Sequence, residues 1–185
     1  MVYLADLWLP ILLSAVAVFI VSSVVHMVLG YHKSDYEGLP GEANILASMR
    51  GESVSPGDYY FPYTSDMKEL STPEMQEKLK QGPVGFMTVI PNGPINMGKS
   101  LSLWFVLCLV IGVIVAYLTG RTVAAGTDYL AVFRIAGTTA FVAHAMGQPS
   151  ASIWRGQKWS TTIKHMFDGL LYGLVTGGVF GWLWP

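Results

Sequence analysis

The chain has 185 residues, of which 52% are hydrophobic and only 12% are charged, and its net charge at pH 7 is −1. A soluble domain has about a quarter of its residues charged, so this composition, with a mean hydropathy of +0.45, indicates a membrane protein. The near-neutral charge argues against a nucleic-acid partner, and the single cysteine, Cys108, excludes an internal disulfide and a cysteine-rich zinc site.

Four apolar runs predict membrane-spanning helices, at about 7–29, 101–118, 129–146 and 163–184. The first run alone reaches about 35 Å at the rise of an α-helix, which is enough to cross a bilayer core. Two tryptophans close the fourth run, and the indole ring favours the membrane–water interface. The sequence therefore predicts an all-α integral membrane protein, a single membrane domain over 1–185 built as a four-helix transmembrane bundle.

The long loop between the first two spans, about 31–99, is too apolar for a solvated linker and is expected to be ordered. Residues 41–50 predict a short amphipathic helix that stops at Gly51, and Thr72 followed by Pro73 predicts a helix that runs to about Lys80. Between these helices, residues 56–63 are aromatic and extended, and residues 84–90 form a strand-like apolar run.

The distribution of lysine and arginine predicts the orientation in the membrane. The long loop and the third loop, about 147–162, lie on one side and carry nearly all the basic residues, whereas the opposite side has only Arg121 unless Arg134 is counted. The positive-inside rule then places both loops in the cytoplasm and both termini outside.

Glycines recur every four residues on the fourth span. They form one smooth stripe on a helix, and small residues in a membrane let another backbone approach closely. The partner is either the third span, through Ala136, Ala140 and Ala143, or a helix from another subunit. The stripe consists of Gly169, Gly173, Gly177 and Gly181.

Charged side chains inside the spans are costly and need a partner. For Arg134, on the third span, Asp6 is the first choice and Asp128 the second; the alternative is that Arg134 extends to the interface. Asp168 lies about one turn inside the fourth span and shares a face with His165 and Tyr172. That face is either a proton relay or a polar mouth wetted by the cytoplasm.

All four histidines fall near the inner ends of the spans. Neutral imidazole suits copper, iron or zinc, thioether sulfur favours Cu(I), and two facing histidines can ligate a haem. If a cofactor such as copper or haem binds, His26 and His144 are expected as the first ligands, followed by His165 and Met166, with His32 less favoured. No tight ligand spacing is present, so interfacial hydrogen bonding by these histidines is the alternative.

Two segments, GPVGFMTVIPNGPINMGKSLSLWF at 82–105 and GVFGWLWP at 178–185, resemble a family of small bacterial four-span inner-membrane proteins. The resemblance covers the chain from about residue 56 onward. It implies a multi-pass protein of the bacterial inner membrane, in which the orientation expected from the positive-inside rule makes the termini periplasmic, and it implies no activity.

No motif amounts to a catalytic signature. The predicted function is therefore non-enzymatic: a structural or accessory subunit of a membrane complex, or a homo-oligomer, whose partners are the lipid bilayer and other membrane subunits or itself. One alternative is a metal- or haem-binding redox or transport protein that uses the inner histidines. Another is a small oligomeric channel lined by Arg134, Asp168 and the pair Thr138 and Thr139.

Overall fold

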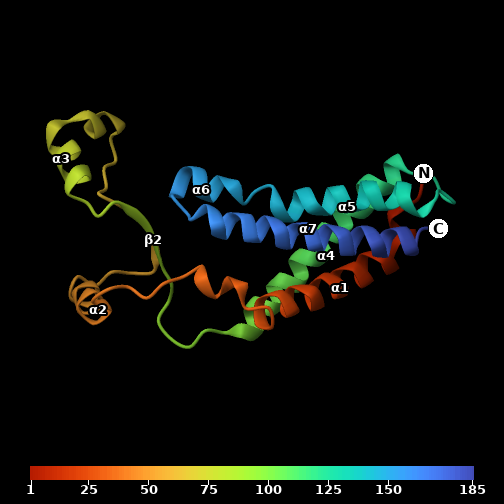
Figure 1. Cartoon of the computed structure of the whole chain (residues 1–185), viewed down its shortest axis with the longest axis horizontal. Coiled ribbons are helices and arrows are strands. Elements are labelled where there is room, and N and C mark those ends of the chain that lie inside the picture. Colours follow the sequence, from red (N-terminus) through yellow and green to blue (C-terminus); the bar gives the residue numbers. More distant parts are fainter. The chain divides into compact units, whose positions relative to one another are not determined.

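The computed structural model describes residues 1–185, most of them helical (Figure 1). The sequence predicts one membrane domain, whereas the structure separates two compact units, because the long loop has helices and a sheet of its own. A helical unit comprises Met1–Tyr36 and Asn96–Pro185, and a loop unit comprises Glu37–Ile95.

Four long helices form the helical unit, and short helical segments flank three of them. These four helices lie at the positions of the four predicted apolar runs, and α6 is an additional short helix inside the predicted third loop. The elements are η1 Leu4–Leu7, α1 Trp8–Met27, η2 Tyr31–Ser34, α4 Met97–Thr122, α5 Tyr129–Ala145, α6 Pro149–Arg155 and α7 Trp159–Trp182.

Three segments are long and apolar enough to cross a membrane: Leu4–Met27, Met97–Thr122 and Tyr129–Arg155. They indicate a multi-pass membrane protein. Helix α7 has 24 residues, which is a sufficient length, but it falls outside this group. Its glycines add little hydropathy, and its first turns carry Lys164, His165 and Asp168.

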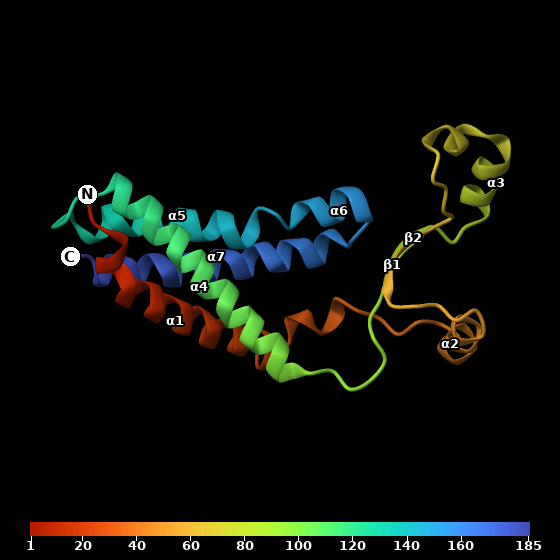
Figure 2. The ribbon, with the colours of Figure 1, turned by 180° about the vertical axis from the view of Figure 1, so that it is seen from behind.

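Both chain termini lie at the same end of the helical unit, as Figures 1 and 2 show from opposite sides. The Val2 amide donates to the Gly120 carbonyl at 3.1 Å, and the Gly126 amide donates to the Pro185 carbonyl at 2.6 Å. The core at this end is shared by η1, α4, α5 and α7, because each contributes a side chain with no exposed surface. These side chains are Leu7, Val115, Val132 and Phe180.

The glycine stripe of α7 packs against α5 of the same chain, and the two helices run antiparallel. A Cβ atom placed on Gly173 would lie 2.9 Å from the Gly137 carbonyl oxygen, and one placed on Gly177 would lie 2.9 Å from the Phe133 carbonyl oxygen. The contact continues to both ends of α5, with Gly169 on Ala145 and Gly181 on Tyr129. The stripe therefore lets two backbones meet directly.

The predicted partner face of α5 is wrong. The glycines meet a row with a spacing of four residues that consists of Tyr129, Phe133, Gly137, Phe141 and Ala145. Ala136 and Ala140 are fully buried in the core that α5 shares with α4 and the N-terminal segment, and Ala143 borders a cavity. The sequence pattern identifies a stripe on each helix, and only the packing decides which stripes meet.

The loop unit contains α2 Glu42–Gly51, β1 Gly57–Phe61, η3 Met67–Ser71, α3 Pro73–Gln81 and β2 Gly85–Val89. Both predicted helices are confirmed, and the Thr72 hydroxyl accepts the Met75 amide at 3.3 Å as the cap of α3. The two extended segments pair as antiparallel strands, with Gly57 opposite Val89 and Phe61 opposite Gly85. The predicted all-α fold thus holds for the helical unit, and the loop unit adds a two-stranded sheet.

Candidate functional site

A polar cluster lies at the end of the helical unit opposite the chain termini, where α1 ends and α7 begins. It consists of His26, Tyr31, His32, His165 and Asp168. Helix α1 ends at Met27, and Gly30 then adopts a φ of +66°, a backbone conformation that favours glycine. This turn leads into η2, whose Tyr31 and His32 contact a side chain of α7.

Asp168 of α7 is the buried centre of this cluster, with 2% of its surface exposed. One carboxylate oxygen lies 2.9 Å from His32 Nε2 and 3.7 Å from His165 Nδ1, and the other accepts the hydroxyl proton of Tyr31. These contacts compensate the burial of the carboxylate. Burial and the hydrogen bond to Asp168 raise the pKa of Tyr31 above its ordinary value, so Tyr31 stays a neutral donor.

The second ring nitrogen of His32 is held by another carboxylate. His32 Nδ1 lies 2.6 Å from Asp35 Oδ2, while Lys164 Nζ donates to Asp35 Oδ1 at 2.7 Å. Burial acts to raise the pKa of Asp35, but the hydrogen bonds from Lys164 and His32 outweigh it and lower the pKa to about 2. Asp35 is therefore an anion that fixes the His32 ring from outside the cluster.

Three histidine rings meet around Asp168. The centroids of His26 and His32 are 4.5 Å apart with the rings at 88°, and those of His32 and His165 are 5.1 Å apart and stacked. Ligand atoms of His26, His32 and Asp168 all lie within 4.8 Å of one another, and the same holds for His32, Asp35 and His165. Each of these two groups could hold a metal ion.

The structure changes the order of the predicted ligands. The sequence favours His32 least among the histidines as a metal ligand. In the structure it lies at the centre of the cluster, in contact with the rings of His26 and His165. His144 is separate from them, since it packs on Trp104 and Tyr172 at centroid distances of 5.9 and 5.2 Å. Met166 is half-buried and does not line the cavity beside the cluster, which is described below.

Sequence reasoning missed Tyr31 and Asp35. The available signal was the spacing of His32 and Asp35, three residues apart immediately after the first span. In a helical turn this spacing places both side chains on one face. The contact with α7 depends on the left-handed turn at Gly30, which the apolar pattern does not reveal.

A cavity of about 510 Å³ adjoins the cluster. His26, His165 and Asp168 border it on one side, and Trp104, His144 and Tyr172 form an aromatic part of its wall. Helix α4 supplies apolar side chains to the remaining wall. Three of the four histidines and the buried carboxylate thus face one space inside the helical unit.

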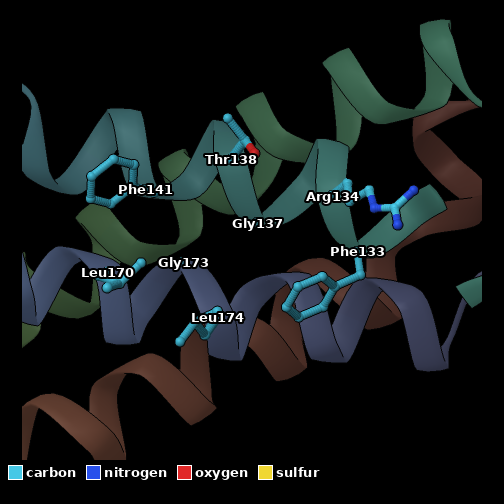
Figure 3. A pocket seen from close by; sticks show the side chains of 8 residues that line it. All are labelled: Phe133, Arg134, Gly137, Thr138, Phe141, Leu170, Gly173 and Leu174. Atoms are coloured by element: carbon cyan, nitrogen blue, oxygen red, sulfur yellow. The ribbon is translucent and has the colours of Figure 1, made fainter. Parts of the chain in front are cut away.

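The predicted pairing of Arg134 with Asp6 or Asp128 is wrong. Asp6 Oδ2 accepts the Tyr3 amide at 3.3 Å, and Asp128 Oδ1 accepts the amides of the first turn of α5, so both acids act locally as helix caps. Arg134 is exposed and has no ion pair; its guanidinium points toward the N-terminal end of α5 (Figure 3).

Arg134 and Thr138 line a separate, smaller cavity of about 190 Å³ over the contact of α5 with α7 (Figure 3). Asp168 does not border this cavity, and Thr139 donates its hydroxyl to the Ile135 carbonyl. The polar residues considered for a channel therefore do not line one common cavity within a single chain.

Comparison with protein-family models, curated proteins and solved structures gives no match.

Proposed function

We propose that the protein is a four-span membrane protein that binds one divalent first-row transition-metal ion through His26, His32, His165 and Asp168. The arrangement of His32 carries this proposal. Its Nδ1 is held by Asp35 at 2.6 Å, and its Nε2 points at the buried Asp168 at 2.9 Å. A metal-binding histidine typically donates its other ring N–H to a carboxylate, a backbone carbonyl or water, which fixes the ring and aims the ligating nitrogen at the ion.

The donor set also suits such an ion. An ion bound here would take the lone pair of His32 Nε2 and displace the proton that Nε2 shares with Asp168, while the Nδ1 proton would stay on the hydrogen bond to Asp35. Imidazole together with carboxylate suits zinc, iron and copper. The ring contacts between His26, His32 and His165 favour a single ion over a haem, because rings in direct contact leave no room for a porphyrin between them.

The packing of α7 supports the fourth span. Helix α7 lies antiparallel on α5 from Gly181 at Tyr129 to Gly169 at Ala145. The segment Tyr129–Arg155, which begins with α5, is apolar enough to cross a bilayer. Because α7 packs along the full length of α5, it lies at the same depth in the membrane. Four spans also agree with the position of both termini at one end.

The metal site faces the cytoplasm and both termini face the periplasm of the bacterial inner membrane. Lys33, Lys99, Arg155, Lys158 and Lys164 flank the ends of the helices near the cluster, as the positive-inside rule requires. The choice of membrane rests on the sequence resemblance. The glycine stripe no longer argues for an accessory subunit, because it contacts α5 of the same chain and not a helix of another subunit.

Metal content of the purified protein tests the proposal. The protein in detergent is stripped with a chelator, loaded with Zn²⁺, freed of unbound ion and analysed by mass spectrometry. We expect one ion per chain in the wild type and at least tenfold weaker binding in His32→Ala and Asp168→Asn. His144→Ala is the matched control, because this histidine lies at the same end outside the cluster, and it should retain the ion.

Asp35→Asn provides a variant that keeps every ligand. Loss of an outer carboxylate typically weakens metal binding about 10- to 100-fold, so a drop of this size, measured well below the melting temperature of the variant, supports the assignment. If the wild type takes up no stoichiometric zinc, copper, iron(II) or manganese, or if His32→Ala binds as the wild type does, the cluster is a hydrogen-bonded anchor between η2 and α7 and the proposal is wrong.

A further inference from the structure

We infer that the cavity beside the cluster binds a neutral, membrane-soluble molecule with a flat, carbonyl-bearing ring, which is the chemistry of a quinone. This inference rests on α4 crossing the membrane and does not require the metal ion. The cavity of about 510 Å³ falls in the size range of small-molecule sites, roughly 300–1,000 Å³, which are mostly apolar with a few polar groups.

The polar end of the cavity offers a hydrogen-bond donor that has no partner. Tyr172 lines the cavity with only 4% of its surface exposed, and its hydroxyl makes no hydrogen bond. Buried hydroxyl groups nearly always have a partner, so the Tyr172 hydroxyl marks a place in the cavity wall where an acceptor is missing. The neighbouring Trp104 is already engaged, because its indole N–H donates to Ser22 Oγ at 2.8 Å.

Aromatic side chains around Tyr172 favour a flat ligand. The ring centroids of Trp104, His144 and Tyr172 lie 5.2–5.9 Å from one another. The three rings come from α4, α5 and α7, so they form one aromatic wall. Aromatic pairs gain from stacked and edge-to-face contacts at these distances, and a planar ring in the cavity extends the same contacts.

The apolar wall opens toward lipid. Leu107, Val110 and Ile114 of α4 line the cavity and are each 45–49% exposed, so the wall continues onto the outer surface of α4. Met97–Thr122 is apolar enough to span a membrane, and its outer surface then faces acyl chains. A ligand dissolved in the bilayer can enter there and leave an isoprenoid tail among the lipids.

Charge at the polar end selects against an anionic head group. In the metal-free protein the buried Asp168 carboxylate borders the cavity, and a carboxylate or phosphate ligand would face it at close range. A carbonyl oxygen carries no net charge and accepts the Tyr172 proton. These features favour a quinone over a fatty acid or an acidic phospholipid.

Binding of ubiquinone-2 to the protein in phosphatidylcholine nanodiscs tests the inference, with empty nanodiscs to subtract partitioning into lipid. A photoreactive azidoquinone, followed by mass spectrometry, maps the contact. We expect saturable binding, labelling within residues 104–114 or 143–148, and about tenfold weaker binding in Tyr172→Phe. Tyr117→Phe is the matched control, because Tyr117 is exposed on the same α4 away from the cavity, and it should bind as the wild type does.

Two further variants make the outcome decisive. Ala143→Trp fills the cavity and should abolish binding, while Asp35→Asn weakens the proposed metal site through a residue that hydrogen-bonds to none of the cavity-lining side chains and should leave quinone binding intact. Equal affinity in Tyr172→Phe, Ala143→Trp and the wild type, or labelling spread over all lipid-facing helices, would overturn the inference. Since Asp35→Asn is tested separately for metal and for quinone, failure of the metal site and failure of the quinone site remain distinguishable.

Discussion

Substitution of single glycines on α7 by alanine tests the direct backbone contact with α5. In Gly173→Ala the new methyl group would lie 2.9 Å from the Gly137 carbonyl oxygen and 2.9 Å from Phe141 Cβ. Both are closer than carbon atoms tolerate, so the helices must separate by several tenths of an ångström. Gly178→Ala is the matched control, because its methyl group would meet only the Tyr129 hydroxyl at 3.6 Å, an ordinary contact.

The two variants share the gain in helix propensity, which is up to about 1 kcal/mol for glycine to alanine. Overpacking of a close contact costs about 1–3 kcal/mol. The difference between the variants therefore isolates the clash, and we expect Gly173→Ala to be less stable than Gly178→Ala by roughly 1–3 kcal/mol.

Reversible unfolding in mixed micelles, titrated with a denaturing detergent and followed by circular dichroism, measures this difference. Gly177→Ala should behave as Gly173→Ala does, because its methyl group would lie 2.9 Å from the Phe133 carbonyl oxygen. Free energies of unfolding that agree within ~0.5 kcal/mol for the variants at 173, 177 and 178 would refute the packing of α7 on α5.

Three further predictions concern other parts of the chain. Arg134→Leu should change the free energy of unfolding by no more than about 0.5 kcal/mol, because Arg134 is exposed without an ion pair; a loss above ~2 kcal/mol in the same titration would reveal a partner. In a Cys108→Ala background, a membrane-impermeant maleimide on intact cells should label Ala124→Cys and spare Asp66→Cys, and the reverse pattern would invert the proposed orientation. Thr72→Ala should destabilise α3 by about 1 kcal/mol through loss of its cap, seen as faster amide exchange confined to that helix; unchanged exchange would argue against the cap.

Much of the fold follows from local sequence signals. Long apolar runs predict α1, α4 and α5, and Thr72 followed by Pro73 marks the start of α3 where the structure has it. The pairing of β1 with β2 was not predicted, because the two strands are separated by more than 20 residues and only their packing brings them together. Helix α7 lies where the sequence predicts a fourth helix, but it is less apolar than the other three, because its glycines serve close packing and add little hydropathy.

The candidate site was harder to predict, because its geometry depends on single contacts between distant segments. The prediction that the histidines gather at one end of the spans holds for all four, and His26, His32 and His165 also meet in one cluster. The choice of His144 as a ligand is not supported, since depth along a helix does not specify which side of it faces a neighbour. The predicted pairing of Arg134 with Asp6 or Asp128 rests on their shared side of the membrane, whereas nearby amides satisfy both acids.

X-ray absorption spectroscopy of the zinc-loaded protein tests the central proposal most directly, because it reports the atoms bound to the ion. The proposed site predicts three imidazole nitrogens and a carboxylate oxygen at about 2.0–2.1 Å, and a count of two imidazoles in His165→Ala. A shell with sulfur at about 2.3 Å, or a shell of oxygens without imidazole scattering, would contradict the assignment of the ion to His26, His32, His165 and Asp168.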